Sequence, residues 1–239
     1  DYTGLPITDE PEQDGTYLYQ EEDKYDFSKF SNIFATIKDG LPDGLWTGWF
    51  PLVWHVATTG SDSTGDGSID NPFATIQTAI DTAGEGDTVL VSAGTYFENL
   101  IWPNTNGIKL IGIGDTTNTI IDGSNADASV IFMYPSSDTL IDTTTLIDNF
   151  RIINGSGTPM FGFGPVGGGL LIREAGPSLK NLYIAENTAV TGAAMMIVGS
   201  NSVLDGIIIT NNVIYSGNEY GWNGHLNDIQ LCSLQLNNI

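Results

Sequence analysis

The sequence is poor in cysteine and in basic residues. A single cysteine, Cys232, occurs among 239 residues, which excludes a disulfide framework within the chain, so the core must come from packing. Only 7 Lys and Arg stand against 29 Asp and Glu, and the formal net charge is −22. So acidic a surface repels nucleic acid, anionic lipid and polyuronate substrates, and attracts divalent cations. There is no run of about 20 apolar residues, so no membrane-spanning helix is predicted.

Four short segments near the carboxyl end resemble one another. Each has Ile or Leu first, apolar residues at the fourth and sixth positions, and a varying residue between those two. The segments are 147–155, 179–187, 204–212 and 231–239. Alternation at period two predicts a strand with one buried face, and Asn or Gly near each segment's end predicts a turn and a ladder of side-chain amides. Leu182, Ile207 and Ile209 are expected to be fully buried.

A second repeat accompanies the first. Residues 167–172 match residues 192–197, which lie 25 positions later, and residues 224–229 are a weaker echo. Each repeat therefore carries at least two strands with a turn between them. Repeats of this length, with short strands and small residues at the corners, are typical of a solenoid. The sequence predicts an all-β chain folded as a parallel β-helix.

A helix is predicted ahead of the first regular strand. Asn71 is a candidate N-cap, Pro72 would take the first helical position, and Gly84 would end the helix. The apolar residues on one face are Phe73, Ile76, Ala79, Ile80 and Ala83. We expect this face to plug the N-terminal end of the β-helix.

Four motifs around this helix carry a family resemblance. They are Gly60-Ser-Asp62, Asn71-Pro-Phe-Ala-Thr-Ile76, Gly86-Asp87-Thr-Val and Gly94-Thr-Tyr96-Phe-Glu98. Together they resemble the N-terminal signature of secreted, pectate-lyase-like, right-handed parallel β-helix proteins. The resemblance implies one such domain over residues 54–239, in a secreted, extracellular or cell-surface protein. The family includes lyases, hydrolases, epimerases, adhesins and surface proteins, so the resemblance implies a fold and no particular activity.

Residues 1–53 form a separate segment in this interpretation, an acidic and aromatic arm. The arm either lies along its own β-helix or reaches a neighbouring molecule. Trp46, Trp49 and Trp54 crowd its carboxyl end. The pattern favours a cap over the open end of the solenoid. Stacking of these rings on sugars is the alternative.

Four aspartates follow one another in turns rich in Gly and Ser: Asp62, Asp66, Asp70 and Asp87. Calcium takes six to eight oxygen ligands, largely from carboxylates and turn carbonyls, so these residues are candidate ligands for a calcium ion. Their spacing is not that of an EF-hand. Plain turn and cap roles compete with calcium, and the pattern favours them.

Groups for catalysis are sparse in the repeats. The basic residues there are Arg151, Arg173 and Lys180, too few for the cationic groove that lyases of the resembled family need. A glycosidase needs two carboxylates about 5–9 Å apart. Asp148 and Asp205 share one position of the repeat, with Lys180 between them in order, and Glu174 and Glu186 are further candidates. The sequence leans away from an enzyme.

The sequence favours a non-catalytic extracellular structural or adhesive protein. Its expected partner is another copy of itself or a cell-surface glycan. End-to-end assembly into a filament would use the last repeat and the N-terminal plug, because a heterologous contact need not close. The expected assembly residues are Leu231, Leu234, Leu236, Phe73, Ile76 and Ile80. The alternative is a carbohydrate-active enzyme, either a polysaccharide lyase or a glycoside hydrolase, or a carbohydrate-binding β-helix.

Overall fold

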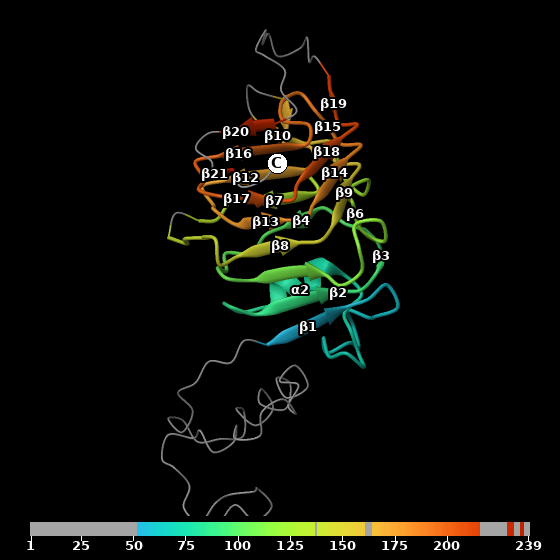
Figure 1. Ribbon diagram of the computed structural model, residues 1–239. Coiled ribbons are helices and arrows are strands. Elements are labelled where there is room, and N and C mark those ends of the chain that lie inside the picture. Colours follow the sequence, from blue (N-terminus) through green and yellow to red (C-terminus); the bar gives the residue numbers. More distant parts are fainter. Residues whose placement is uncertain (1–51, 137, 161–163, 216–228, 232–234, 237–239) are drawn as a thin grey trace, which may run out of the picture.

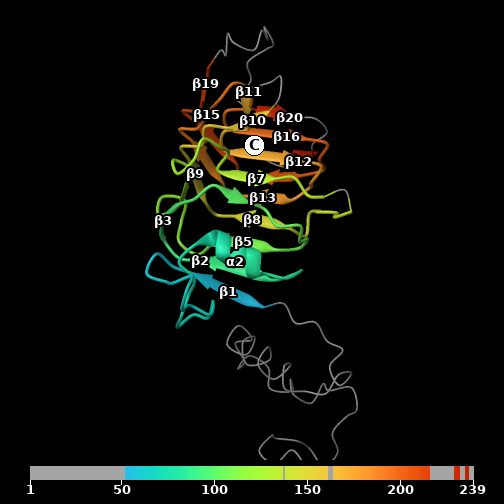
Figure 2. The ribbon, with the colours of Figure 1, turned by 180° about the vertical axis from the view of Figure 1, so that it is seen from behind.

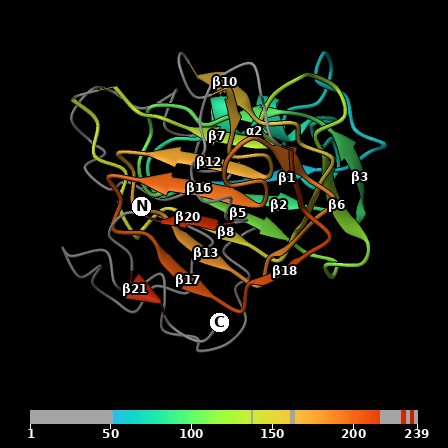
Figure 3. The ribbon, with the colours of Figure 1, turned by 90° about the horizontal axis from the view of Figure 1, so that it is seen from above.

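In the computed structural model, the chain winds in coils whose strands form three parallel sheets around one apolar core (Figures 1 and 2). The structure describes residues 52–136, 138–160, 164–215, 229–231 and 235–236. The predicted residues Trp46, Trp49 and Leu234, and the arm up to residue 51, lie outside this part. Viewed down the stack of coils, the sheets form the walls of the molecule (Figure 3). The fold is a right-handed parallel β-helix, as the sequence predicts.

The first sheet is the longest and has seven strands. In spatial order they are β1 (Val53–Val56), β2 (Thr88–Val91), β5 (Lys109–Gly112), β8 (Leu146–Asp148), β13 (Ser178–Lys180), β17 (Val203–Asp205) and β21 (Gln235–Leu236). All its pairs are parallel. Because the strands are parallel and in register, equivalent side chains of successive coils stack on one another. The column that faces the core runs from Trp54 through Val89 and Leu110 to Leu204.

The second and third sheets have five strands each. The second contains β3 (Gly94–Phe97), β6 (Thr119–Asp122), β9 (Arg151–Ile153), β14 (Tyr183–Ala185) and β18 (Ile208–Thr210). The third contains β4 (Leu100–Ile101), β7 (Ile131–Met133), β12 (Leu170–Arg173), β16 (Met195–Val198) and β20 (Ile229–Leu231). Two small pairs complete the topology: antiparallel β10 (Thr158–Met160) with β11 (Gly164–Val166), and parallel β15 (Thr188–Ala189) with β19 (Val213–Ile214).

Each of the first three predicted nine-residue strands is in fact two strands in different sheets. The chain bends between β8 and β9, between β13 and β14, and between β17 and β18. The residue at each bend has a positive φ: Asn149 at 67°, Asn181 at 47° and Gly206 at 65°. Asn and Gly tolerate this left-handed conformation better than other residues, so the third position of the repeat makes a corner that strand periodicity does not reveal.

The pairing register confirms three of the four repeats and corrects the last. Leu179 pairs with Ile147 on one side and Leu204 on the other. The predicted equivalent in the fourth segment, Leu231, instead pairs with Ile197 in the third sheet, and Leu236 takes the place beside Leu204. Several leucines at short spacing fit more than one register, and pairing with the preceding coil decides between them.

The core lies inside the three walls. The largest side chains that are fully buried are Phe150, Ile76, Ile80, Leu100, Ile108, Leu110, Ile121, Ile131, Met133, Ile141, Ile147 and Ile152. Leu182 and Ile207 are buried as predicted. Ile209 is only half-buried, because its strand, β18, ends the second sheet and has a neighbour on one side only among the described strands.

The helix is shorter than predicted. It is α2 (Ile76–Thr82), and its N-cap is Thr75, whose side chain accepts a hydrogen bond from the Thr78 N–H. Asn71 and Pro72 are therefore not its cap and first residue. Phe73 precedes the helix and forms a bridge to β1 at Val56. The buried face of α2 still covers the N-terminal end of the core, through Ile76, Ala79 and Ile80, as expected.

Asparagine amides at Asn187 and Asn212 join neighbouring coils, which confirms the predicted ladder there. The Asn187 side chain is fully buried. Its Oδ1 accepts from the Gly155 N–H, and its Nδ2 donates to the carbonyls of Ile152 and Ala185 and to the Oδ1 of Asn212, at 2.8–3.0 Å. Asn212 repeats this pattern one coil later. These amides satisfy backbone groups that the corner leaves unpaired.

Candidate functional site

The acidic residues of the N-terminal motifs hold the backbone around α2. Asp62 accepts from the Ala74 and Thr75 N–H groups at 2.8 and 3.0 Å. Glu98 accepts from the next two, Ile76 and Gln77, at 2.8 and 2.9 Å. Two carboxylates thus bind four consecutive N–H groups at the start of the helix, where a helix leaves donors unpaired. Local sequence patterns do not reveal this role of Glu98, although the residue lies in one of the four motifs.

The pKa values of these two acids move in opposite directions. For Glu98, burial raises the pKa, the hydrogen bonds from Gln77 and Ile76 oppose that rise, and the net shift is upward. For Asp62, burial also raises the pKa, but the hydrogen bonds from Thr75 and Ala74 outweigh it and the net shift is downward. The difference follows the exposure of the two side chains, because Asp62 is exposed and Glu98 is half-buried.

The four aspartates proposed as calcium ligands do not converge. Asp87 is buried and accepts from the Leu52 N–H, the Gly84 N–H and the Trp54 indole. Asp66 accepts from the Ser68 N–H, and Asp70 is exposed. In the described part of the chain no three His, Cys, Asp or Glu side chains form a group that could hold a metal ion. Calcium binding stays a prediction, and a fall in Tm in excess chelator would be its signature.

Of the predicted aromatic and assembly residues, Trp54, Phe73, Ile76 and Ile80 lie in the N-terminal cap. The Trp54 ring packs against Phe73, with centroids 6.0 Å apart, and its indole nitrogen is bonded to Asp87, which fits a capping role. Phe73, Ile76 and Ile80 are buried in their own chain and present almost no side-chain surface to a neighbour. For Leu231 and Leu236 the structure gives the strand pairing alone.

The candidate glycosidase pair is separated by a lysine. Asp148, Lys180 and Asp205 pair in register on consecutive strands of the first sheet. Neighbouring strands lie about 4.8 Å apart, so the two aspartates are two strand spacings from each other, with Lys180 on the strand between them. The Asn181 amide also binds Asp148, at 2.9 Å. This column does not offer two facing carboxylates.

Two glutamates stand out at the corners of the coils. Six non-glycine residues in the described part have positive φ, and apart from four asparagines they are Glu174 at 53° and Glu186 at 59°. The next coil has Gly199 at the position of Glu174, and the neighbouring coils have Asn154 and Asn211 at the position of Glu186. The chain therefore uses a less suitable residue at two corners of one coil.

These positions carry strain without a matching gain in stability. A non-glycine residue held in the left-handed region costs on the order of 1–3 kcal/mol. Glu186 makes an ion pair with Arg151, but exposed pairs contribute only about 0–1 kcal/mol. Strained residues cluster at functional sites, so the surfaces around the two glutamates are candidate functional sites.

Glu174 borders the outer face of the third sheet. We call this surface the third-sheet face and define it by Ile101, Phe132, Tyr134, Arg173, Glu174 and Met196. Arg173 lies over the ring of Tyr134, with the guanidinium carbon 4.6 Å from the centroid. Tyr134 and Ile101 are 45% and 63% exposed.

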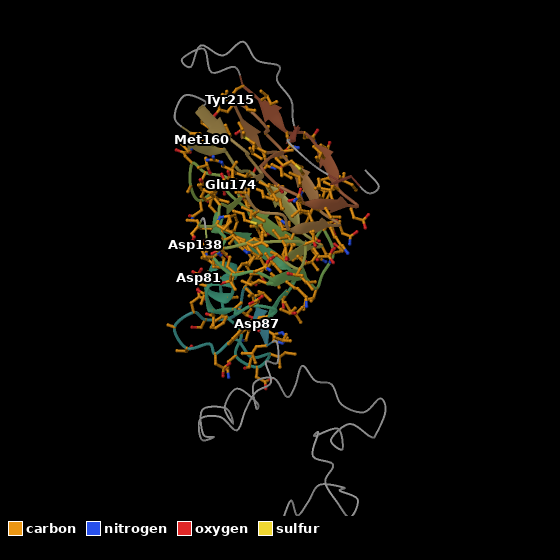
Figure 4. The ribbon with its side chains drawn as sticks, turned by 90° about the vertical axis from the view of Figure 1, so that its left-hand side faces the viewer. Asp81, Asp87, Asp138, Met160, Glu174 and Tyr215 are labelled. Atoms are coloured by element: carbon orange, nitrogen blue, oxygen red, sulfur yellow. The ribbon has the colours of Figure 1, made fainter. Side chains whose placement is uncertain are left out.

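Loops flank this face on more than one side. The β10–β11 hairpin stands beside the third sheet (Figures 2 and 3), and Val166 of β11 forms an isolated bridge with Thr191, which lies between β15 and β16. Figure 4 shows Glu174 at the edge of the molecule, between Met160 of the hairpin and Asp138 of the loop that follows β7. Excursions from the coil are where a rigid scaffold usually carries its binding residues.

The chemistry of the third-sheet face suits a polar ligand with apolar patches. Arg173 brings a planar set of N–H donors, and Glu174 brings acceptor oxygens. Tyr134 and Ile101 provide exposed aromatic and aliphatic surface. Phe132 and Met196 are half-buried, on either side of the fully buried Leu171. A binding site for a small molecule commonly combines apolar surface with a few placed polar groups. Arg173 and Glu174 are candidates from the sequence, whereas the contact between Tyr134 and Arg173 is evident only in the structure.

Comparison with known proteins finds distant similarity to solved structures only. No protein-family model matches the chain, and no curated protein does. Among solved structures it is similar to a pectin methylesterase from carrot, with 17% identity and a TM-score of 0.46 over 72% of this chain and 56% of that one. It is similar to pectin methylesterase PemA from Erwinia chrysanthemi, with 12% identity and a TM-score of 0.45 over 72% and 58%.

A rhamnogalacturonan lyase is similar at 16% identity, with a TM-score of 0.37 over 67% of this chain and 52% of that one. The chain thus spans little more than half the length of these three proteins. Such identities and scores do not indicate a shared activity. Within the described residues, no helix has the length and apolar character that crossing a membrane requires.

Proposed function

We propose that the chain is a carbohydrate-binding β-helix protein that acts outside the cell or at its surface, and that the third-sheet face is its binding site. The observation that carries the proposal is the stack of Arg173 on the exposed ring of Tyr134, on a face that also carries a strained glutamate and the exposed side chain of Ile101. Sugar rings present both hydroxyl groups and apolar C–H faces, so they match such a surface. This is the carbohydrate-binding alternative of the sequence analysis, in a form that keeps the expected lack of catalysis.

The ligand in this proposal is a neutral glycan. A net charge of −22 repels polyuronates from the whole surface, and one arginine does not offset it. Turnover is not part of the proposal, because the face contributes one carboxylate, Glu174, and a glycosidase needs two. Adhesion to a glycan would be a non-catalytic role of the kind that the sequence favours.

Binding measurements on the full chain test the proposal. The probes are cellohexaose, mannohexaose and xylohexaose, with trigalacturonate as the anionic comparison, and the readout is isothermal titration calorimetry. We expect binding of at least one neutral probe that weakens roughly tenfold or more in Arg173→Ala, since hydrogen bonds from a charged group are lost. Tyr134→Ala should have a similar effect. Lys109→Ala, on the first sheet, removes the same charge from an exposed position and is the matched control.

Two results would contradict the proposal. One is that no neutral hexasaccharide binds. The other is that Arg173→Ala and Lys109→Ala reduce affinity equally, which would point to overall charge instead of a site. Release of reducing or unsaturated ends from the probes should stay at background, and enzymatic release lost in Arg173→Ala would make the protein an enzyme.

A further inference from the structure

The second strained glutamate belongs to a cluster on a different wall of the molecule. The Glu186 Oε1 accepts from an Arg151 terminal nitrogen at 2.8 Å, and the guanidinium carbon of Arg151 lies 5.1 Å from the ring centroid of Tyr183. Ile208, one strand further along the same column, is 57% exposed. We call this cluster of four residues the second-sheet face. It repeats the combination found on the third-sheet face: an arginine on a tyrosine ring, an exposed isoleucine and a glutamate of positive φ.

Stability does not account for the second-sheet cluster. The arginine and glutamate side chains are 29% and 48% exposed, so solvent weakens their attraction. The Arg151 Nε is buried and has no hydrogen-bond partner in the described part of the chain. Glu186 is strained where the neighbouring coils use Asn154 and Asn211. An asparagine at position 186 would give a less strained corner, and the ion pair that glutamate allows is the one evident gain.

We propose that the second-sheet face is a second glycan-binding site, so that one molecule bridges two neutral glycan chains. This inference rests on the proposed function of the third-sheet face. The Arg151–Glu186 pair joins one nitrogen to one oxygen and leaves a donor edge beside an acceptor edge on an exposed surface. Two adjacent hydroxyl groups of a sugar match that arrangement, because one accepts from the guanidinium group while the other donates to the carboxylate.

The placement of the two faces supports bridging. They lie on the second and third sheets, which are different walls of the β-helix (Figure 3). A glycan on one wall therefore does not cover the other. The sheets belong to one rigid stack of coils, so the distance between the two bound chains would be fixed. A protein with two such sites would cross-link polysaccharide chains instead of only coating them.

The experiment counts sites and measures cross-linking with the full chain. Calorimetry with the neutral hexasaccharide that binds best should give a stoichiometry of two for the native chain and one for Glu186→Asn. The native chain should also precipitate a long polysaccharide of the same sugar, and Glu186→Asn should not. Because asparagine suits positive φ, Glu186→Asn should melt at the same temperature as the native chain or higher, which separates lost binding from lost folding. Arg151→Gln provides a second variant of the same site.

The outcomes separate this inference from the proposed function. Binding that responds to Arg173→Ala but keeps its stoichiometry in Glu186→Asn and Arg151→Gln overturns the second site and leaves the proposed function intact. Binding that responds only to the second-sheet variants overturns bridging and the assignment of the third-sheet face. Absence of binding by the native chain overturns both. A drop from two sites to one in both second-sheet variants, with precipitation lost, supports the inference.

Discussion

The side chain of Gln77 pairs with the backbone of Ile101 as a neighbouring strand would. Its Nε2 donates to the Ile101 carbonyl at 2.9 Å, and its Oε1 accepts from the Ile101 N–H at 2.8 Å. Ile101 belongs to β4, which is the edge strand of the third sheet. One amide from α2 thus closes an open sheet edge, which would otherwise be free to pair with another chain.

Replacing Gln77 should therefore loosen the N-terminal end. Gln77→Met keeps the length and helix propensity of the side chain but removes both hydrogen bonds to Ile101, and we expect a loss of about 1–3 kcal/mol in the free energy of unfolding. Urea denaturation measures this loss. Gln77→Glu should be more damaging at neutral pH than in acid, since an ionised carboxylate cannot donate to the carbonyl. Equal stability of Gln77→Met and the native chain would show that the edge needs no cap.

Removing the buried amide of Asn187 should be more costly. In Asn187→Ala the Gly155 N–H and the Ile152 and Ala185 carbonyls lose their partner, at about 1–3 kcal/mol for each group left unsatisfied. We expect a large fall in the urea midpoint. Asn201→Ala, at an exposed position, is the control and should change stability by less than about 0.5 kcal/mol. Equal urea midpoints for the two variants would show that the asparagine ladder does not stabilise the fold.

Adjacent isoleucines test the orientation of the coil. Ile207 is 7% exposed and faces the core, whereas Ile208 is 57% exposed and faces outward. Ile207→Ala should cost about 2–5 kcal/mol, because it leaves a cavity. Ile208→Ala should be close to neutral in thermal or urea unfolding. A larger loss of stability in Ile208→Ala than in Ile207→Ala would show that Ile208, and not Ile207, faces the core.

Acid titration should reveal Glu98. Its pKa is raised in the folded chain, chiefly by burial, so the folded state holds the proton more tightly than the unfolded state. Its contribution to stability therefore grows as pH falls through the raised pKa, and is complete below the unfolded value near 4.5. Stability of the native chain relative to Glu98→Gln should rise from neutral pH towards that value.

The opposite sign applies to the aspartates with lowered pKa values. Asp62, Asp66, Asp115 and Asp142 are held below 3.8 by hydrogen bonds, so their contribution is present above that pH and is lost as pH falls through their folded pKa values. For the prediction about Glu98, the control is Glu85→Gln, which changes a glutamate at an exposed position. A difference between native and Glu98→Gln that falls on acidification from neutral pH would refute the assignment.

Sequence patterns predicted the fold well, because aligning the repeats also aligns the residues that pair between neighbouring coils. Ile147, Leu179 and Leu204 pair as the segments align. The corner inside each segment was missed because Asn149 and Asn181 interrupt no apolar position of the pattern, and their positive φ leaves no mark on it. The fourth segment was placed five residues off because Leu231 and Leu236 both satisfy the repeat, and only pairing with Leu204 decides.

The candidate sites could not be predicted from the sequence repeats. Tyr134 and Arg173 are far apart in sequence and meet because Met133 pairs with Ile172 across the intervening excursion. Arg151 and Glu186 meet in the same way, across one coil. The sequence offered these residues as isolated charges, and neither the length of each coil nor the direction of each side chain could be read from local spacing.

Two adjacent coils of the described part have a constant spacing. Leu170 pairs with Met195, Leu179 with Leu204 and Ile184 with Ile209, and in each pair the numbers differ by 25. Any in-frame excision or duplication of 25 codons within this stretch would therefore return every strand, corner and amide to an equivalent neighbour. Unequal recombination could lengthen or shorten the protein by one whole coil at a time without a new packing solution. The distance spanned along the β-helix axis would then be a trait that can vary in single steps between relatives.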